Sequence, residues 1–291
     1  MTGQFTAQKS GLPDRERVHR ILAGRRTKLN FGNMSTVYMI WEPKKDGKGN
    51  PLPKPFYYDL CQRTVLNHNP KAQIVNMDEA KEIIGDIPDV IKEHYIAHQT
   101  DWVRKMLVYS TGGLYVDSDF ICLKPLDFLA DMSNHIDMAI PKQPNGQWMD
   151  NFLVAKKGSE TAKHAADVAL RMMTNKRPRQ GGPFSGIPDK DGRPCINWLD
   201  PSARALHEAI NHWQRRSLIL QIPTTWIHPM PLNRQWFFTP KQDEGIPYAR
   251  SCYGYITSVH KFNKKINQFK SEKELLGSNT RVAALIKAGL G

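Results

Sequence analysis

Two aspartates separated by one residue, Asp117 and Asp119, are the side chains in this sequence best placed for metal chemistry. They follow Leu114-Tyr115-Val116, a short run that predicts a strand, and an extended chain through Asp119 would direct both carboxylates to one face. Carboxylate oxygens suit Mg²⁺ and Mn²⁺, and few protein carboxylates are needed where substrate phosphates complete the coordination. The spacing therefore predicts a divalent cation beside Asp117-Ser118-Asp119, although such a triplet also occurs by chance.

The segment before this triplet predicts a helix over residues 100–111, with Thr100 as its N-cap and Gly112-Gly113 after its end. Because glycine has no Cβ, we expect this pair to let the helix end close to the following strand. Asp101 then lies in the first turn, where a carboxylate is favourable. Asp101 and Arg104 are three residues apart and share a face, so we expect both to reach the site of the two aspartates. Together they can hold sugar hydroxyls by charge-assisted hydrogen bonds, and the alternative is an ordinary ion pair within the helix.

The order Asp-x-x-Arg, an apolar helix and Gly-Gly-x-Tyr-x-Asp-x-Asp resembles the sugar-binding region of glycosyltransferase family 32. That family includes initiating α-mannosyltransferases, capsular-polysaccharide synthesis proteins and glucosylating toxins. The close match spans residues 100–119, with weaker similarity from Trp41 to near His260. The matching positions are Asp101, Arg104, Gly112, Gly113, Tyr115, Asp117 and Asp119.

This resemblance implies a hexosyltransferase with a GT-A type, Rossmann-like, mostly parallel sheet flanked by helices in a single α/β domain. It implies a nucleotide-diphosphate-sugar donor, Mn²⁺ or Mg²⁺, a glycan or lipid-linked acceptor, retention of configuration and a place in polysaccharide biosynthesis. Asp101 and Arg104 would hold the donor sugar, Asp117 the sugar or ribose, and Asp119 the metal.

The weaker similarity adds residues at both ends of the region. Ile40-Trp41 ends a predicted strand, where the Trp41 ring would stack on the nucleotide base, and the alternative is a core tryptophan. His260 would reach the metal or diphosphate, and the alternative is a surface histidine, since the following residues depart from the family pattern. Further donor contacts are expected from Ile40, Tyr115, Ser118, Asp150, Asn151, Lys261 and Lys265.

Two features concern the reaction itself. Asp150 is the first candidate for a general base if the enzyme inverts configuration instead of retaining it. Gly182-Pro183 resembles a turn on the acceptor side, within a long loop over 176–200 of the kind that often serves as a lid.

Hydrophobic periodicity supplies the framework for these residues. Strands are predicted at 36–41, 72–76, 114–116 and 153–155 and before His260, with helices at 56–67, 78–84, 160–173 and 203–213. Alternation of strands and helices predicts a parallel sheet. We expect a basic arm at 1–34, the GT-A domain at 35–270 and a C-terminal amphipathic helix at 271–291.

The charge balance points to anionic partners. Lys and Arg number 41 against 28 Asp and Glu, a net charge of +13, which suits a diphosphate or an anionic membrane. A metal-dependent nucleic-acid-binding or nucleotidyl-transfer protein is the competing interpretation. Because no helix-turn-helix or RNP sequence is present, no nucleic acid is expected. An N-terminus without an apolar stretch and four cysteines without a C-x-x-C pair favour a cytoplasmic protein with reduced thiols, in peripheral contact with a membrane.

Overall fold

The structure is a computed structural model that describes residues 36–43, 46, 48–143, 146–176, 195–227, 237–238, 252–257 and 265–291. All of these residues belong to one compact unit. Several predictions fall outside the described residues: the arm at 1–34, most of the loop at 176–200 with Gly182-Pro183, and both His260 and Lys261.

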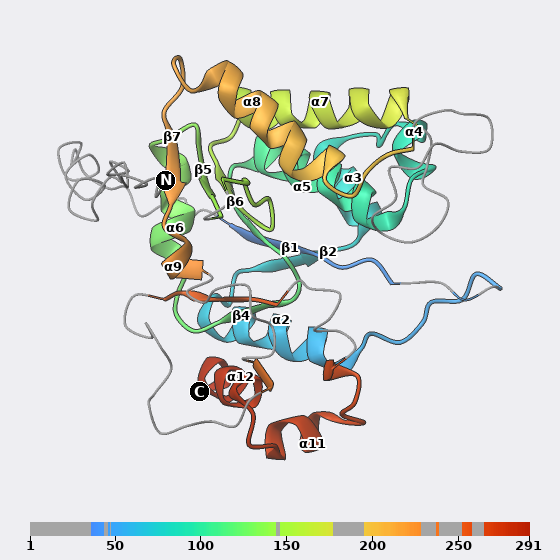
Figure 1. Ribbon diagram of the computed structural model, residues 1–291, viewed down its shortest axis with the longest axis vertical. Coiled ribbons are helices and arrows are strands. Elements are labelled where there is room, and N and C mark those ends of the chain that lie inside the picture. Colours follow the sequence, from blue (N-terminus) through green and yellow to red (C-terminus); the bar gives the residue numbers. More distant parts are fainter. Residues whose placement is uncertain are drawn as a thin grey trace, which may run out of the picture. The chain divides into compact units, whose positions relative to one another are not determined.

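A six-stranded sheet in the order β2-β1-β3-β6-β5-β7 forms the centre of this unit (Figure 1). Its strands are β1 (Val37–Ile40), β2 (Gln73–Val75), β3 (Gly113–Val116), β5 (Met138–Pro141), β6 (Phe152–Ala155) and β7 (Ile219–Ile222). β1 pairs in parallel with β2 and β3, and β5 pairs in parallel with β7. Only β6, antiparallel to both β3 and β5, runs the other way among these six. The predicted α/β architecture with a mostly parallel sheet is confirmed.

One face of the sheet is covered by helices on the side of α5 (Figure 1). They are α3 (Met77–Ile84), α4 (Asp89–Lys92), α5 (Ile96–Thr111), α7 (Glu160–Asn175) and α8 (Ala205–Trp213), with a π-helix at Asp200–Arg204 before α8. Alternate strand residues, among them Tyr38, Ile40 and Tyr115, pack with Val103 and Leu107 of α5 in one buried cluster. The period of two along each strand thus directs one set of side chains to these helices.

On the other side of the sheet, a two-stranded ribbon and three helices form a second layer (Figure 1). β4 (Phe120–Cys122) pairs antiparallel with β8 (Gly254–Ile256), beside α2 (Phe56–His68), α11 (Glu272–Gly277) and α12 (Arg281–Leu290). Ile121, Tyr255 and Leu285 share a buried cluster there. The remaining short elements are α6 (Asp127–Asp131), a 3-10 turn at Met132–Asn134 and α9 (Thr224–Ile227).

The predicted start of the helix at 100–111 was wrong. α5 begins at Ile96 after Tyr95, so Asp101 is not in its first turn and Thr100 is not its N-cap. The Thr100 hydroxyl instead donates to the carbonyl of Ala97 at 2.8 Å, the bond of a threonine inside a helix. The first turn of α5 has no side-chain cap, so an N-cap residue could not reveal where this helix begins.

The C-terminal amphipathic helix predicted at 271–291 is two helices. Ser271 caps α11 by accepting from the backbone N–H of Glu274, and Thr280 caps α12 by accepting from that of Ala283. The hydroxyl of Ser278, between the helices, donates to the carbonyl of Leu275 at 2.7 Å. Side chains that bond to nearby backbone compete with a continuous helix, and so the chain turns between Gly277 and Arg281.

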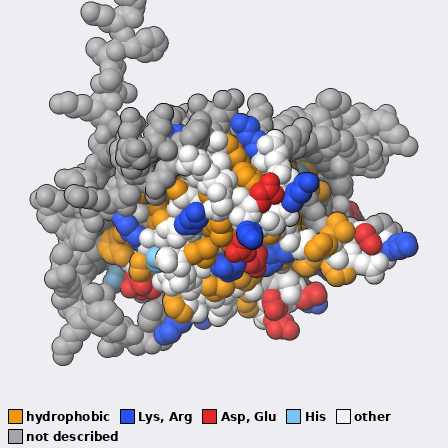
Figure 2. Space-filling model, turned by 90° about the horizontal axis from the view of Figure 1, so that it is seen from below, with side chains coloured by type: hydrophobic (Ala, Val, Ile, Leu, Met, Phe, Trp, Pro, Cys, Tyr) orange, Lys and Arg blue, Asp and Glu red, His pale blue; other side chains and the backbone are white. Residues whose placement is uncertain are grey.

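Surface charge is mixed on the face shown in Figure 2, where described lysine and arginine side chains alternate with acidic and apolar ones. All four cysteines are buried and free. Within the described residues, none of the helices has the length and apolar character that crossing a bilayer would require.

Candidate active site

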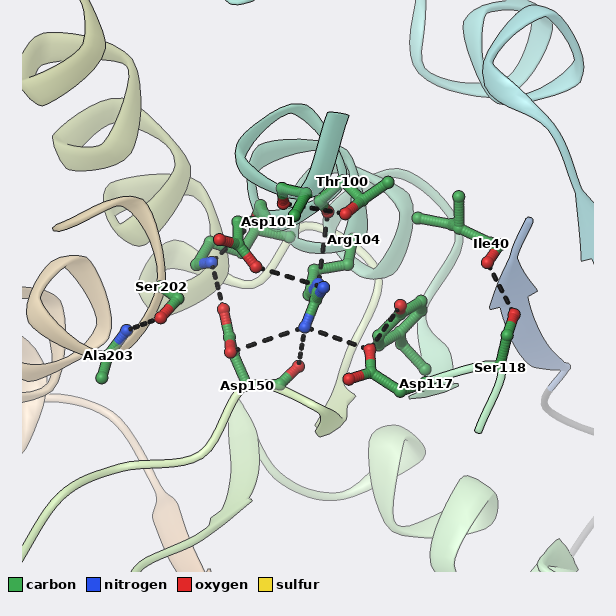
Figure 3. Close-up of polar contacts among 12 residues, drawn as sticks. Ile40, Thr100, Asp101, Arg104, Asp117, Ser118, Asp150, Ser202 and Ala203 are labelled. Carbon is green, nitrogen blue, oxygen red and sulfur yellow. Dashed lines mark hydrogen bonds and ion pairs between the residues drawn. The ribbon is translucent and has the colours of Figure 1, made fainter. Parts of the chain in front are cut away.

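The guanidinium of Arg104 is the centre of a buried charge cluster that joins α5 to the segments around β3 and β6 (Figure 3). Its Nη2 lies 3.1 Å from Oδ1 of Asp101, as predicted from their spacing on one helix face. Its Nη1 lies 3.2 Å from Oδ1 of Asp117 and 3.5 Å from Oδ1 of Asp150. Arg104 therefore connects three carboxylates that come from three parts of the chain, and we call these residues together with Lys105 the Arg104 cluster.

Lys105 is the member of this cluster that the sequence analysis missed. Its side chain is 0% exposed, and its ammonium lies 2.8 Å from Oδ2 of Asp150 and 2.6 Å from the backbone carbonyl of Asp101. A lysine four residues after Asp101 lies on the same helix face. That spacing was the available signal, but it did not reveal the partner Asp150.

The two aspartates of the D-x-D triplet lie in a turn, so the prediction of an extended chain through Asp119 was wrong. β3 ends at Val116, and the backbone N–H of Phe120 donates to the carbonyl of Asp117 at 3.0 Å. The chain turns here because the next strand, β4, leaves the central sheet to pair with β8. Asp117 is held in place by the Tyr115 hydroxyl, which donates to its Oδ1 at 2.8 Å.

Asp119 presents a buried oxygen to this site. The residue is 6% exposed, and its Oδ1 has no hydrogen-bond partner among the described residues. Burial first, and then the charge of Asp117, raise its pKa to about 8. β8 fixes the turn from the other side, since the hydroxyl of Thr257 donates to the backbone carbonyl of Asp119 at 2.8 Å.

A lone carboxylate oxygen of this kind fits a hard divalent cation whose other ligands are phosphate oxygens and water. In the described part of the chain, His, Cys, Asp and Glu side chains do not assemble into a group of three or more around a common metal position. The predicted second ligand, His260, lies outside the described residues.

Gly112 and Gly113 bring the end of α5 directly onto the sheet. Both have positive φ, 73° and 104°, a backbone region that favours glycine. A Cβ on Gly112 would lie 2.8 Å from the backbone nitrogen of Lys157, and one on Gly113 would lie 2.4 Å from the carbonyl oxygen of Thr36. The predicted reason for the glycine pair, close approach of backbone, is confirmed.

A chain of hydrogen bonds ties the triplet to the end of β1. The hydroxyl of Ser118 donates to the carbonyl of Ile40 at 2.6 Å and accepts from the amide of Gln62 at 3.1 Å. The ammonium of Lys54 in turn donates to the Gln62 amide oxygen at 2.5 Å. Ser118 and Ile40, both predicted donor contacts, are thus brought together.

The predicted base-stacking residue lies beside the same turn. The ring of Trp41 packs on that of Tyr58 with centroids 4.7 Å apart, and Lys54 lies 5.5 Å from the Trp41 centroid. Burial raises the pKa of Tyr58 to about 12, with further contributions from the charges of Asp119 and Asp117. Because Ile40, the residue before Trp41, accepts a hydrogen bond from Ser118, the aromatic pair lies close to the D-x-D turn.

Comparison with known proteins finds a family likeness in this part of the chain. Residues 55–139 match the family model described as a glycosyltransferase sugar-binding region containing DXD motif. This segment resembles a glycosyltransferase sugar-binding region. The match supports a function in glycosyl transfer, and it agrees with the resemblance to family 32.

Other comparisons add little detail. None of the curated proteins matches the chain. The solved structures that align with it include a glycosyltransferase named PaToxG, with 13% identity over 62% of this chain and 68% of that one and a TM-score of 0.41. They also include an active-site mutant of LgtC, with 8% identity over 83% of this chain and 99% of that one and a TM-score of 0.39.

The carboxylates of the Arg104 cluster differ in their electrostatic environment. Burial and the charge of Asp150 raise the pKa of Asp101 to about 8, and burial raises that of Asp117 as well. For Asp150, burial would raise the pKa, but Lys105 and Arg104 outweigh it, so that the pKa falls below its ordinary value. Asp150 is therefore held ionised by its two cationic neighbours.

Three further residues, Tyr115, Asn151 and Lys265, were predicted to contact the donor. Tyr115 is buried, and its ring packs against the guanidinium of Arg104, which lies 4.9 Å from the ring centroid. The carbonyl of Asn151 accepts from the backbone N–H of Asp117 at 3.0 Å, which anchors the turn to β6. Lys265 lies 5.5 Å from the ring centroid of Phe238, and among the described residues it makes no ion pair with the Arg104 cluster.

Proposed function

We propose that this protein is a metal-dependent glycosyltransferase that moves a hexose from a nucleotide-diphosphate-sugar to a hydroxyl group of a glycan or lipid-linked acceptor. The observation that carries the proposal is the D-x-D turn itself. It presents a buried Asp119 oxygen without a partner among the described residues, next to Asp117, which Arg104 holds. A cation position and a polar sugar position would thus be adjacent.

Donor recognition would divide between the two sides of the turn. On the α5 side, the guanidinium of Arg104 offers charged donors to sugar hydroxyls, and the carboxyl groups of Asp101 and Asp117 offer acceptors. On the β1 side, the half-buried ring of Trp41 offers a π-face to the nucleotide base, backed by Tyr58. The diphosphate would lie between them, beside Asp119.

Asp119 would hold Mn²⁺ or Mg²⁺, with His260 as the second protein ligand. When bound, the cation neutralises the charge that develops on the departing nucleoside diphosphate. Lys261 and Lys265 are proposed to offset further diphosphate charge. Asp119 must be ionised to bind a cation, and the cation's own charge would lower the raised pKa of this carboxyl.

Retention of configuration is proposed because the described carboxylates of the cluster are already engaged. Both Asp150 oxygens are in ion pairs, one with Lys105 and one with Arg104, which makes this residue a poor general base. The acceptor oxygen would bond to the anomeric carbon on the face that the nucleotide leaves. As the bond from that carbon to the phosphate oxygen breaks, the acceptor proton passes to the departing phosphate. The anomer of the product, measured by NMR, tests this step.

A screen of nucleotide-sugars tests the function. We expect one donor class to be hydrolysed slowly in the presence of Mn²⁺ or Mg²⁺, to raise Tm, and to lose both effects when EDTA removes the metal. If none of the uridine, guanosine, cytidine or thymidine diphosphate sugars is turned over or raises Tm, the proposed function is wrong.

A nucleic-acid enzyme remains the second candidate because of the +13 charge. Two-metal catalysis on nucleic acid requires several carboxylates that are free to bind cations. Here Asp101, Asp117 and Asp150 are paired with Arg104 or Lys105, which favours the sugar-binding function. A filter-binding assay with DNA and RNA at low and high salt separates the two, since salt-sensitive binding would support the nucleic-acid enzyme.

A further inference from the structure

Lys105 is a fully buried cation that no position of the Asp-x-x-Arg motif requires. Its neighbours along α5, Val103, Met106 and Leu107, are apolar and pack in the main core cluster. Removing an ammonium group from water costs several kcal/mol unless it is paired. Its two partners, the carboxylate of Asp150 and the backbone carbonyl of Asp101, must therefore stay in place for the helix to pack.

The pairing affects Arg104 as well as Asp150. Three carboxylates, those of Asp101, Asp117 and Asp150, share two cations, Arg104 and Lys105. The ammonium of Lys105 lies 2.8 Å from Oδ2 of Asp150, whereas Nη1 of Arg104 is farther from this carboxylate, at 3.5 Å from Oδ1. Nη1 of Arg104 is left closer to Asp117, at 3.2 Å.

Without Lys105, the Asp150 carboxylate would remain buried with Arg104 as its one cationic partner in the cluster. The backbone carbonyl of Asp150 already accepts from Nη1 of Arg104 at 3.2 Å, so its carboxylate needs only a small movement to draw the guanidinium closer. That movement would take Nη1 away from Asp117, because one N–H group cannot serve both carboxylates well.

We propose that Lys105 is a positioning residue for donor-sugar binding: by neutralising Asp150, it keeps the Arg104 guanidinium aimed at Asp117 and Asp101. This inference rests on the proposed function. Lys105 itself does not reach the substrate, since its side chain is buried and its ammonium is engaged by Asp150 and Asp101. Its effect is on the sugar and not on the nucleotide, because its ammonium contacts Asp150 and Asp101, whereas Trp41 packs on Tyr58.

The test compares Lys105→Met, which keeps the length of the side chain but not its charge, with the double variant Lys105→Met/Asp150→Asn. In the single variant we expect kcat for donor hydrolysis to fall by about 10 to 100-fold, as for a reacting group misplaced by a fraction of an ångström. The Kd for the nucleoside diphosphate with Mn²⁺ should stay unchanged. In the double variant, Asp150 no longer attracts Arg104, so we expect kcat to recover by about tenfold relative to the single variant.

Two further measurements separate positioning from folding. Lys163→Met removes an exposed lysine that pairs with Asp167 on α7, and it should leave kcat and Tm unchanged. If Lys105→Met does not fold, the double variant, which lacks both the lysine and the aspartate charge, still tests the proposal. The proposal then requires that the double variant fold and retain turnover.

The outcomes distinguish this inference from the function on which it rests. A wild-type protein without donor hydrolysis overturns both. An active wild type with an equally active Lys105→Met variant overturns only the positioning role. So does a loss of nucleoside diphosphate affinity that matches the loss in kcat, or a double variant no better than the single one.

Discussion

Nη1 of Arg104, on α5, lies 3.2 Å from Oδ1 of Asp117, in the turn that follows β3. The contact connects the segment after β3 to the middle of α5. The glycine pair that joins α5 to β3 allows these two elements to lie close together. Because the same nitrogen also faces Asp150 at 3.5 Å, small changes in charge around Arg104 should alter how it meets Asp117.

Replacement of Arg104 by lysine tests the forked geometry. Lysine keeps the positive charge but cannot contact Asp101 and Asp117 through two separate nitrogens. We expect kcat/KM for the nucleotide-sugar to fall on the order of 100-fold, with Tm close to that of the wild type. Arg171→Lys, at an exposed pair with Glu208, is the matched control and should behave as wild type. An Arg104→Lys variant with full efficiency would remove Arg104 from the sugar site.

Asp119→Asn tests the metal assignment. The amide keeps the shape of the side chain but lacks the negative charge that a cation needs. Loss of several kcal/mol of transition-state stabilisation should reduce metal-dependent turnover by at least about 1000-fold. Circular dichroism and Tm verify the fold, and Asp167→Asn, on the exposed face of α7, serves as the control. Unchanged turnover in Asp119→Asn contradicts the assignment.

Trp41→Ala tests nucleotide stacking. An aromatic ring that stacks on a base contributes about 1 to 3 kcal/mol, and so Kd for the nucleoside diphosphate should rise by about 5 to 150-fold. Trp41→Phe retains a ring and should lose much less. Calorimetric titration provides the values, with Trp213→Ala as a control on α8, where the indole donates to His164. If wild type and Trp41→Ala bind the nucleoside diphosphate with equal affinity, Trp41 does not stack on the base and only packs in the protein core.

Gly113→Ala tests the close approach of α5 to the sheet. The new Cβ would lie 2.4 Å from the carbonyl oxygen of Thr36, at a φ of 104°. Gly85→Ala shares a positive φ of 85° but meets open space, so it reports the backbone strain alone. We expect the Gly85 variant to lose about 1 kcal/mol of unfolding free energy and the Gly113 variant clearly more, by urea denaturation. Similar losses of unfolding free energy in both variants would show that the backbone at Thr36 moves away from the new Cβ at little cost.

The raised pKa of Asp101 predicts a pH-dependent stability. Burial and Asp150 raise this pKa from 3.8 to about 8, while Arg104 and Lys105 oppose the rise and Asp117 adds to it. The folded state therefore binds a proton more tightly than the unfolded state does. This contribution to stability is fully present below about pH 4 and is lost as the pH rises through about 8.

Asp101→Asn isolates this contribution, since an amide does not titrate. Between about pH 6 and about pH 9, the wild-type Tm should fall more than that of the variant. Asp119 titrates in both proteins, and so the difference between the two curves belongs to Asp101 and the charges coupled to it. Parallel curves would mean that Asp101 is already ionised in the folded protein at about pH 6.

Much of the site was predictable from local spacing. Side chains three residues apart meet on a helix, and this brought Asp101 to Arg104. A run of β-branched and aromatic residues before Trp41 indicated β1, and the glycine pair indicated a tight junction between α5 and β3. Such signals are readable because helix and strand geometry repeat over a few residues.

Other parts of the site depend on contacts between distant segments. The turn at Asp117 exists because β4 pairs with β8, and Thr257 at the end of β8 then holds the backbone of Asp119. Likewise, nothing in the neighbourhood of Lys105 along the chain indicates Asp150 as its partner. Burial and pairing are properties of packed layers, and a charge acquires its pKa and its role from whichever side chains the fold encloses with it.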